Sequence, residues 1–497
     1  MNLDKESGMP LYAQIRDDIH ASILQGILSP GTRLPSVQAM AHDRQVTQAT
    51  IRRALQDLIE DGLVESHVGR GTFVTRGAHP NQSHTLSARP RSIQIPDDSL
   101  SKSIEELLSL SSNSACIAFT RGIGDTGTLP EGILSRLAHK ALSRGESLFW
   151  DSGDSRGLPE LRESISRMYS VNGYSVRPEQ VLITSGSQQA ITLVAQQAAH
   201  NGTPVLCESP CYAGVINSFN AFGLSPKTLS RDEDGIHPDS LASVTEPSLL
   251  YLCPLVHNPM GTDISPAKHQ GIADWATRTG STLLSDEIFR DLHFSNDAHS
   301  CSEQSSFLAR PGLSHAIILG SLSKSFISGL RVGWIVSSED KIASLARIKR
   351  AMDLGCPPLM QGIALAFLED EHGYKAHRLR MITHYQERRD ATLQALADNM
   401  PSGVTWTYPS GGFQLWLTLP PGASSLTLLP LAIDAGVSFL PGPLQDSEYR
   451  CINSLRLCYG SLSPAEISEG IRRLAKVIRM YLTERHQDPI PAGIGDY

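Results

Sequence analysis

The segment GSLSKSFISGLRVGW, from Gly320 to Trp334, places one lysine among small hydroxyl residues. Lys324 follows Ser323 directly and Ser321 by three positions, and Arg331 comes seven residues later. A lysine amine that forms a Schiff base needs small neighbours, so that an aldehyde can approach it. Serine hydroxyls and a bidentate arginine suit a phosphate dianion. The segment therefore indicates a site for a phosphorylated aldehyde, although a solvated loop can have the same composition.

The bulk composition describes a globular chain of more than one domain. The 497 residues are 40% apolar and 19% charged, and the net charge is -8, so any contact with nucleic acid must be local. No run approaches the roughly 18 apolar residues of a membrane span. The first ten residues lack the apolar core of a signal peptide. We therefore expect a cytoplasmic protein without a membrane partner.

The cysteines do not indicate a metal site or a disulfide framework. All eight are scattered singly, without a CxxC pair or a Cys/His cluster of zinc spacing. We expect reduced thiols and no bound metal.

Residues 1–75 have the pattern of a small winged helix-turn-helix domain. Apolar residues recur at helical spacing from Leu11 to Gln25, Ser36 precedes a short helix, and Thr47 can cap a third helix. Residues 64–75 alternate around two glycines, as a hairpin does. The order of three helices and a hairpin predicts a DNA-binding unit.

The charge of this unit is uneven. Residues 1–75 hold seven Lys/Arg and nine Asp/Glu, but residues 33–53 hold four arginines (33, 44, 52, 53) and one acid, Asp43. Positive charge around the second and third helices is what a recognition helix needs near DNA. A small helical interaction domain is the alternative.

The rest of the chain predicts a linker, a large α/β domain and a tail. Residues 76–112 begin with a stretch rich in Ser, Pro and charge and include a possible short helix at 100–110. Residues 113–486 alternate short apolar strands with helices, which predicts a doubly wound, mostly parallel sheet. Residues 487–497 are expected to be disordered. The strands are expected at 181–184, 204–208, 249–253, 282–285 and 316–320, and the helices at 188–199, 266–279 and 340–351.

Polar residues follow these strands, at the sheet edge where ligands bind in doubly wound folds. Ser187 opens a helix and can bind phosphate, Tyr212 can stack on a planar ring, and Asn258 lies beside a Pro-Gly turn. Asp286 ends a strand and can pair with a pyridinium nitrogen, and Arg456 suits a carboxylate. Each of these five residues also has an ordinary structural explanation. In the same order, these are a strand-to-helix turn, a core tyrosine, a turn asparagine, a helix cap and a surface ion pair.

Residues 10–74, from PLYAQIRDDIH through PGTRLPS to GRGTFV, resemble the GntR-type winged helix. The resemblance implies that a set of residues in the second and third helices and the wing contacts DNA, namely Arg33, Ser36, Thr47, Thr50, Arg52, Gly69, Arg70 and Gly71. Gln38 and Gln48 stand where the family usually has arginine. Glutamine can read adenine but contributes no charge toward phosphate, so we expect an altered sequence preference and weaker binding.

Residues 115–480 resemble the fold-type I pyridoxal-phosphate aminotransferases of class I/II. The motifs SGSQQA, ESPCY, NPMG, DEIF, SLSK and SLRL stand in the family's order. The family's fold is a doubly wound domain with a smaller α+β domain. The resemblance implies that Lys324 forms the Schiff base, Asp286 pairs with the ring nitrogen, Asn258 bonds the ring oxygen and Tyr212 stacks on the ring. The implied phosphate residues are Ser187, Gln188, Ser321, Ser323 and Arg331, and Arg456 and Gly122 are the implied substrate residues.

Two departures from this family concern the cofactor. Phe289 stands where a tyrosine usually follows the aspartate by three positions, which removes a hydrogen bond to the ring oxygen. Residues 148–162 lack the usual tyrosine ahead of Gly157. We expect both departures to change the cofactor affinity.

A GntR-type head joined to an aminotransferase-like body resembles the MocR subfamily of bacterial transcription regulators. This resemblance implies a homodimeric regulator that binds pyridoxal phosphate and DNA and senses an amino acid or amine. An active aminotransferase that carries a DNA-binding head is the alternative from another class. A scaffold with an empty site is a third reading, which Lys324, Asp286 and Arg331 disfavour. The sequence does not indicate the effector, the operator or the sign of regulation.

Overall fold

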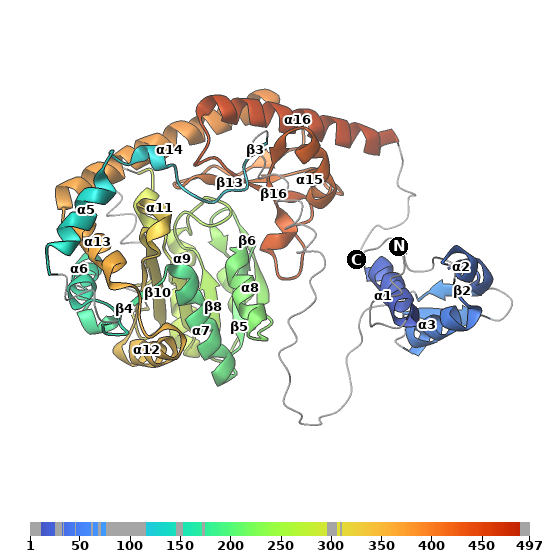
Figure 1. The fold of residues 1–497 in the computed structure, drawn as a ribbon, viewed down its shortest axis with the longest axis horizontal. Coiled ribbons are helices and arrows are strands. Elements are labelled where there is room, and N and C mark those ends of the chain that lie inside the picture. Colours follow the sequence, from blue (N-terminus) through green and yellow to red (C-terminus); the bar gives the residue numbers. More distant parts are fainter. Residues whose placement is uncertain are drawn as a thin grey trace. The chain divides into compact units, whose positions relative to one another are not determined.

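The protein divides into two compact units, Met1–Arg91 and Ser92–Tyr497, here called the head and the body. The computed structural model describes residues 11–24, 32, 34–44, 46–60, 63–67, 71–75, 116–145, 153–170, 174–295, 306–308 and 311–487. The predicted linker, the helix expected at 100–110 and the tail from residue 488 lie outside these ranges. Figure 1 shows the helices and strands of both units.

The head has the predicted three helices and hairpin. The elements are α1 Leu11–Leu24, α2 Val37–Asp43, α3 Gln48–Glu60, β1 Val64–His67 and β2 Gly71–Val74. Ile15, Ile51 and Leu58 are fully buried between the helices. Ser36 Oγ accepts the backbone N–H of Ala39 at 3.1 Å, so this serine caps α2 as predicted.

The large sheet of the body has eight strands in the order β4-β11-β10-β9-β8-β5-β6-β7. The strands from β10 to β6 are parallel, β11 is antiparallel to both of its neighbours, and β7 is antiparallel to β6. The bounds are β4 Val181–Thr184, β5 Val205–Ser209, β6 Lys227–Asp232, β7 Gly235–Ile236, β8 Leu249–Leu252, β9 Thr282–Asp286, β10 Ala316–Ser321 and β11 Gly333–Val336. The five predicted strands are confirmed, and β6, β7 and β11 are additional to them.

Helices cover both faces of this sheet, which confirms the doubly wound prediction (Figure 1). Leu249 and Tyr251 of β8 pack toward one layer, whereas Leu250 and Leu252 pack toward the other, because side chains alternate along a strand. One layer holds α7 Ser187–Asn201, α8 Ala213–Ala221 and α12 Glu339–Asp353. The other holds α5 Ile133–Leu142, α6 Pro159–Tyr169, α9 Pro266–Thr279 and α13 Pro358–Leu368. The short helix α11, Leu322–Ser325, follows β10 directly.

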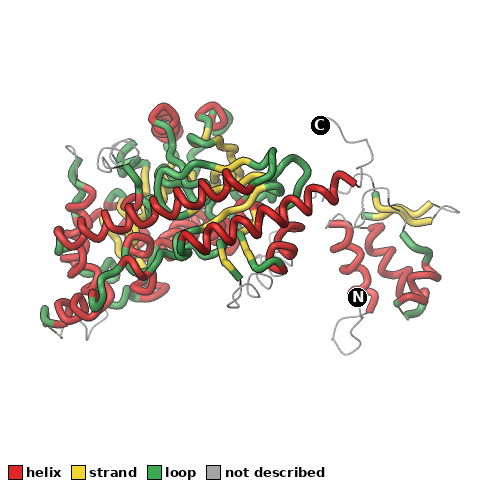
Figure 2. The backbone as a smooth tube through the Cα atoms, turned by 90° about the horizontal axis from the view of Figure 1, so that it is seen from above, coloured by secondary structure: helices red, strands yellow, loops and turns green. Residues whose placement is uncertain are grey.

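A smaller α+β part follows in the chain and has its own core. Its antiparallel sheet has the order β12-β13-β16-β15, and α14 and α16 lie side by side (Figure 2). A separate pair joins β3, from the start of the described body, to β14. The bounds are β3 Ile117–Ala118, β12 Thr405–Trp406, β13 Gln414–Thr418, β14 Val437–Ser438, β15 Leu440–Pro441, β16 Ser454–Cys458, α14 Glu371–Asn399, α15 Ser425–Asp434 and α16 Pro464–Gln487.

Short 3-10 helices connect several of these elements. They are η1 Thr126–Thr128, η3 Pro178–Gln180, η4 Pro238–Leu241, η5 Arg290–Leu292, η6 Ser328–Leu330 and η7 Gly442–Gln445. Among the helices that the structure describes, none is long and apolar enough to cross a membrane.

The strand before the lysine needs a glycine at position 320. Gly320 of β10 is the cross-strand partner of Trp334 of β11. A Cβ atom at Gly320 would lie 2.1 Å from Trp334 Nε1, which donates to the Tyr169 hydroxyl at 3.2 Å. Because this indole is buried and held, it cannot move aside cheaply.

We therefore expect Gly320→Ala to destabilise the body by about 1–3 kcal/mol, the usual cost of overpacking. Gly329→Ala is the control, because the atom nearest to its added Cβ would be Ile327 Cγ2 at 3.9 Å. Thermal unfolding of the purified protein compares the two, and equal midpoints would show that Trp334 does not enforce the glycine.

Candidate functional site

The predicted body residues lie at the carboxyl edge of the large sheet. Asp286 ends β9, Lys324 follows β10, Tyr212 follows β5 and Asn258 follows β8. Arg456 comes from β16 of the smaller part. The charges of Asp286, Arg456 and Arg331 all act on Lys324, so the fold brings these residues to one place.

The Lys324 side chain is partly buried, and its amine donates to the backbone oxygen of Gly122. The rings of Phe289 and Phe413 have their centroids 5.9 Å from the amine nitrogen. Burial is the main cause that lowers the pKa of Lys324 below its ordinary value. A lowered pKa enlarges the neutral fraction of the amine, which is its nucleophilic form.

Asp286 is a buried carboxyl group with 3% of its surface exposed. Burial raises its pKa to about 6, against the hydrogen bond that the Tyr251 hydroxyl donates to Oδ2 at 2.9 Å. The backbone N–H of Ile288 donates to the other oxygen at 3.3 Å. An ionised carboxylate in this position gains stability from a cationic N–H donor that is buried with it.

A second group of residues forms a corner where helix N–H groups and Arg331 meet, here called the anion-binding corner because an anion would suit these donors. Arg331 has a φ angle of 51°, and its Nη2 donates to Ser185 O at 3.1 Å. A Cβ at Gly186 would lie 2.6 Å from this nitrogen, so only glycine leaves the corner open. Ser187 begins α7, and the first N–H groups of a helix have no partner within the helix and favour anions.

The structure distinguishes Ser321 from Ser323, the two serines beside Lys324 that were predicted to bind phosphate. Ser321 is buried, and its hydroxyl accepts the Ser323 N–H at 3.1 Å as the cap of α11. Ser321 Oγ also lies 3.1 Å from Val332 O. Its hydroxyl is therefore engaged inside the protein, whereas the Ser323 side chain is only partly buried.

Gln188 fixes the tyrosine that was predicted to stack on a ring. The Tyr212 hydroxyl donates to Gln188 Oε1 at 3.1 Å. The Gln188 amide nitrogen donates to Gly214 O at 3.1 Å and to the Ser218 hydroxyl at 2.8 Å. The Gln188 side chain thus orients Tyr212. The backbone N–H of Gln188 stays available for an anion.

Arg456 presents one unpartnered nitrogen in a buried position. The residue is 8% exposed, Nη1 donates to Asn258 Oδ1 at 3.1 Å and Nη2 donates to Thr120 O at 3.3 Å. Its Nε has no hydrogen-bond partner among the described residues. A Cβ at Gly122 would lie 3.8 Å from Nη2, so the backbone at Gly122 passes beside the guanidinium group. A carboxylate ligand would satisfy this arginine.

Sequence reasoning missed a chain of contacts behind the anion-binding corner. The Ser185 N–H donates to Gln189 Oε1 at 2.8 Å, and the Gln189 amide donates to Asp353 Oδ2 at 2.6 Å. The fully buried Lys349 pairs with the other oxygen of Asp353 at 2.9 Å. No sequence pattern links residues of α7 with the end of α12. Tyr251 was also missed, although it stands on the strand next to Asp286 and on the same face.

A buried ion pair supports the turn that carries Asn258. Arg231 Nε lies 3.0 Å from Glu208 Oε2, and both side chains are fully buried. His257 Nε2 lies 3.3 Å from Glu208 Oε1. Burial alone would raise the pKa of Glu208, but His257 and Arg231 hold it below its ordinary value. Burial and Arg231 lower the pKa of His257 to about 4, so this imidazole is neutral near pH 7.

The structure exposes five of the ten predicted DNA-contacting residues of the head. Ser36, Gln38, Thr47, Gln48 and Arg52 are exposed, and Thr50 is partly buried. Gly71 begins β2, whereas Arg33, Gly69 and Arg70 lie outside the described residues.

Two of the four arginines that were counted as positive charge near DNA are engaged within the head. Arg44 pairs with Asp18 of α1 at 2.6 Å. The Arg53 guanidinium lies 4.4 Å from the centroid of the Tyr12 ring. Both arginines therefore also serve the packing of α1.

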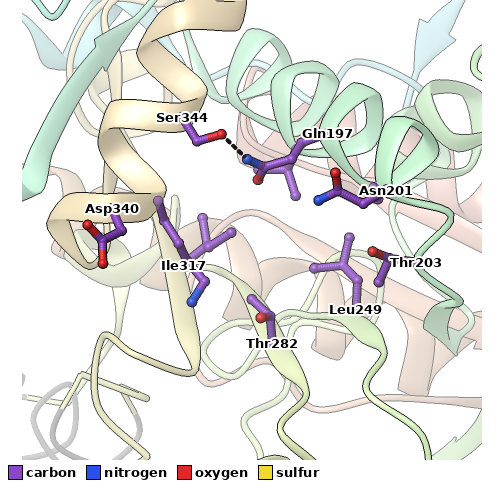
Figure 3. Close-up of a pocket in the computed structure, with 11 residues that line it drawn as sticks. Gln197, Asn201, Thr203, Leu249, Thr282, Ile317, Asp340 and Ser344 are labelled. Carbon is purple, nitrogen blue, oxygen red and sulfur yellow. Dashed lines mark hydrogen bonds between the residues drawn. The ribbon is translucent and has the colours of Figure 1, made fainter.

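A separate pocket of about 310 Å³ lies at the opposite edge of the large sheet (Figure 3). Leu249 and Thr282, the first residues of β8 and β9, line it together with Ile317 of β10. Gln197 donates to the Ser344 hydroxyl at 2.7 Å across its rim (Figure 3). The pocket lies at the amino ends of the parallel strands and contains none of the predicted site residues.

The profile of the family described as "Aminotransferase class I and II" matches residues 126–474. The profile of "Bacterial regulatory proteins, gntR family" matches residues 11–74. The chain is a GntR-type regulator fused to a class I/II aminotransferase domain. This combination is that of the MocR subfamily, and the observed body has the fold-type I architecture of the aminotransferases.

Individual relatives support both parts. The HTH-type transcriptional regulator YdfD of Bacillus subtilis, itself uncharacterised, is 28% identical over 96% of this chain and 98% of its own length. The 2-aminoadipate transaminase of Thermus thermophilus is 31% identical over 76% of this chain and 93% of its own. A crystal structure of LysN, an alpha-aminoadipate aminotransferase from Thermus thermophilus complexed with N-(5'-phosphopyridoxyl)-L-leucine, is 29% identical. It has a TM-score of 0.69 and covers 77% of this chain and 95% of that one.

The aminotransferase domain replaces the usual tyrosine after Asp286 by a packed phenylalanine. Phe289 is 3% exposed, and its ring meets that of Phe413 edge-on at 5.3 Å between centroids. The replacement makes this side of Lys324 apolar. The other departure falls partly on residues 148–152, which lie outside the described residues.

The raised pKa of Asp286 predicts a pH-dependent cost to stability. Between an unfolded pKa near 4 and the folded value of about 6, the folded protein holds a proton that the unfolded chain releases. Stability therefore falls as pH rises through this window. We expect cofactor-free Asp286→Asn to gain stability over the wild type across the same window, by on the order of 2 kcal/mol at pH 7.

Thermal unfolding between pH 4 and pH 7 measures this difference. The exposed Asp434→Asn is the control, because its carboxyl group is not buried. Parallel midpoint curves for the wild type and Asp286→Asn would contradict the raised pKa.

Proposed function

We propose that the aminotransferase-like domain binds pyridoxal phosphate and an amino acid or amine, and that this binding controls how the head binds DNA. The observation that carries the proposal is the set of Lys324, Asp286 and Arg456. A partly buried amine with a lowered pKa, a buried carboxyl group and a buried guanidinium nitrogen without a described partner meet at one sheet edge. Each is costly in an apolar interior unless a ligand completes it.

The residues present fit the cofactor. Asp286 would hold the ring nitrogen, Tyr212 the ring face, and Arg331, Ser323 and the first N–H groups of α7 the phosphate. When bound, the cofactor supplies an aldehyde that amines attack and a ring that withdraws electrons. Lys324 provides the amine, and the open corner at Gly186 admits an anion beside Arg331.

The carboxylate of an amino acid would lie on Arg456. Its unpartnered Nε and the nitrogen beside Gly122 give a bidentate arrangement that suits a carboxylate. An amine without a carboxylate would leave this nitrogen unpartnered, so the site favours amino acids over simple amines.

The proposal for DNA rests on the exposed residues of α2 and α3. We propose that a homodimer presents two heads to an operator in the cytoplasm, because GntR-type heads of this size offer few base contacts each. Ligand binding would then act through its different affinity for two states of the protein.

An active aminotransferase is the second candidate. It is favoured by the 31% identity to a 2-aminoadipate transaminase and by the presence of Lys324, Asp286 and Arg456 together. The two candidates differ in the fate of the bound amino acid, because only the enzyme exchanges its amino group with a keto acid.

We expect the purified protein with pyridoxal phosphate to show a visible absorption band that Lys324→Ala abolishes. Lys341→Ala is the control, since this partly buried lysine lies by the pocket at the opposite sheet edge. A band that shifts with one amino acid and then stays supports a sensor. A band that is lost and returns with a keto acid supports the enzyme, and a band that survives in Lys324→Ala contradicts both.

We expect Gln48→Arg to tighten DNA binding by about 2- to 10-fold, because it adds one phosphate contact. The slope of the logarithm of the affinity against the logarithm of the salt concentration should become steeper by about one. Gel shifts would use a DNA fragment that the wild-type protein selects from a random library. Gln394→Arg is the control, because it adds the same positive charge at an exposed position of the body. Equal affinities for the wild type and Gln48→Arg would remove Gln48 from the DNA interface.

A further inference from the structure

A cavity of about 490 Å³ lies next to Lys324 in the body. Gly124 and Ser323 line it. Ser323 directly precedes Lys324, and Gly124 follows two residues after Gly122, whose backbone oxygen accepts a hydrogen bond from the lysine amine. Its volume falls in the range of small-molecule sites. The cavity is therefore a place where part of a ligand at Lys324 can extend.

The run Thr120 to Gly124 orders the groups that such a ligand would meet. Arg456 bonds to Thr120 O and lies beside Gly122, the lysine amine bonds to Gly122 O, and the cavity begins at Ile123. An amino acid whose carboxylate lies on Arg456 and whose nitrogen reaches Lys324 would direct its side chain toward Ile123 and Gly124.

The wall of the cavity is mostly apolar. Its apolar side chains come from the run after β3, from α5, from the segment after Lys324 and from α14. They are Ile123, Leu129, Ile133, Leu134, Phe326, Ile327 and Met381. Ile123 and Leu134 are each 45% exposed, so apolar surface of the hollow faces water in this structure. A bound apolar group would remove this surface from water.

The one charged residue among the described lining is Asp125, and it is already neutralised. Its Oδ2 accepts Arg388 Nη2 at 2.8 Å and lies 3.0 Å from His384 Nε2. Because Arg388 also lies 3.0 Å from His384 Nδ1, the proton of this imidazole is on the side of Asp125. Burial lowers the pKa of His384, so near pH 7 the ring is neutral. This cluster offers no cation to a ligand inside the cavity.

Tyr385 fixes the floor of the cavity. Its hydroxyl accepts the Asp125 N–H at 3.0 Å, and a Cβ at Gly124 would lie 2.6 Å from it. Burial raises the pKa of Tyr385 to about 12, so the hydroxyl stays neutral. No lysine or arginine lines the described wall. Arg388 is already engaged by Asp125, so a ligand carboxylate in the cavity would have no cation of its own to pair with.

We propose that the ligand sensed by this protein is an amino acid with an apolar side chain, branched aliphatic or aromatic, which this cavity receives. The inference rests on the proposed function, since Lys324 and Arg456 must hold the rest of the ligand. Acidic amino acids are disfavoured, because the cavity offers them no cation.

The test is an equilibrium titration of the full-length protein loaded with pyridoxal phosphate. Leucine, phenylalanine, glutamate and 2-aminoadipate are compared by the shift of the visible absorption band and by titration calorimetry. We expect leucine or phenylalanine to bind at least about tenfold more tightly than either acidic amino acid.

A variant with a matched control sharpens the test. Leu134→Arg adds a guanidinium group to the cavity wall at an exposed position of α5, and Leu142→Arg adds the same group at the end of the same helix, away from the cavity. The two leucines are 45% and 42% exposed. We expect Leu134→Arg to tighten glutamate binding and weaken leucine binding, each by about tenfold, and Leu142→Arg to change neither.

The outcomes separate the inference from the function on which it rests. Glutamate binding as tightly as leucine in the wild type overturns the apolar assignment and leaves the proposed function standing. A Lys324-dependent band that no amino acid shifts overturns the proposed function and the assignment with it. Unchanged thermal midpoints show that both arginine variants are folded.

Discussion

The burial of the Asp286 carboxyl group is the constraint on which the body depends. Parallel strands end together at one edge, and β8 and β9 hold Tyr251 and Asp286 side by side at that edge. An isolated carboxylate is expensive in such a place, and burial raises the pKa of Asp286 to about 6, so above that pH the folded protein carries the cost of a buried charge. If the proposed cofactor binds here, the site gives up stability in exchange for the ability to bind a cationic ring, which is a common balance at functional sites.

The run from β3 to Asp125 connects this edge to the smaller part of the body. β3 pairs with β14, the oxygen of Gly122 meets the lysine amine, and Asp125 bonds to Arg388 of α14. The wall of the ligand cavity is thus attached to the smaller part, whereas the lysine belongs to the large sheet. A ligand that fills the cavity contacts both at once, which gives it a physical means to favour one arrangement over another.

The sequence predicted the architecture well because its signals were local. Strand ends, helix caps and short motifs are read from adjacent residues, and the strands and helices expected around Asp286 and Lys324 were found within a few residues of their predicted bounds. The residues that were missed act across long separations. Gln189 meets Asp353, and Tyr385 reaches Gly124, through packing that no local pattern records. The hydroxyl of Ser321, which the family resemblance assigns to phosphate, accepts the Ser323 N–H in this structure, and its role toward phosphate stays a prediction.

In the head, counting arginines in the sequence overestimates the positive charge that is free to meet DNA. The sequence offered four arginines near the recognition helix, yet Arg44 pairs with Asp18 and Arg53 lies over Tyr12. With Gln38 and Gln48 in positions that are usually basic, we expect a single head to have a reduced electrostatic affinity for DNA. Two weakly binding heads joined in one dimer would depend strongly on their mutual spacing, because the second contact is gained only where the geometry allows it. In a dimer of the kind proposed, weak heads would make the regulator more responsive to its ligand, since a small rearrangement in the body would then decide whether one head or two can bind.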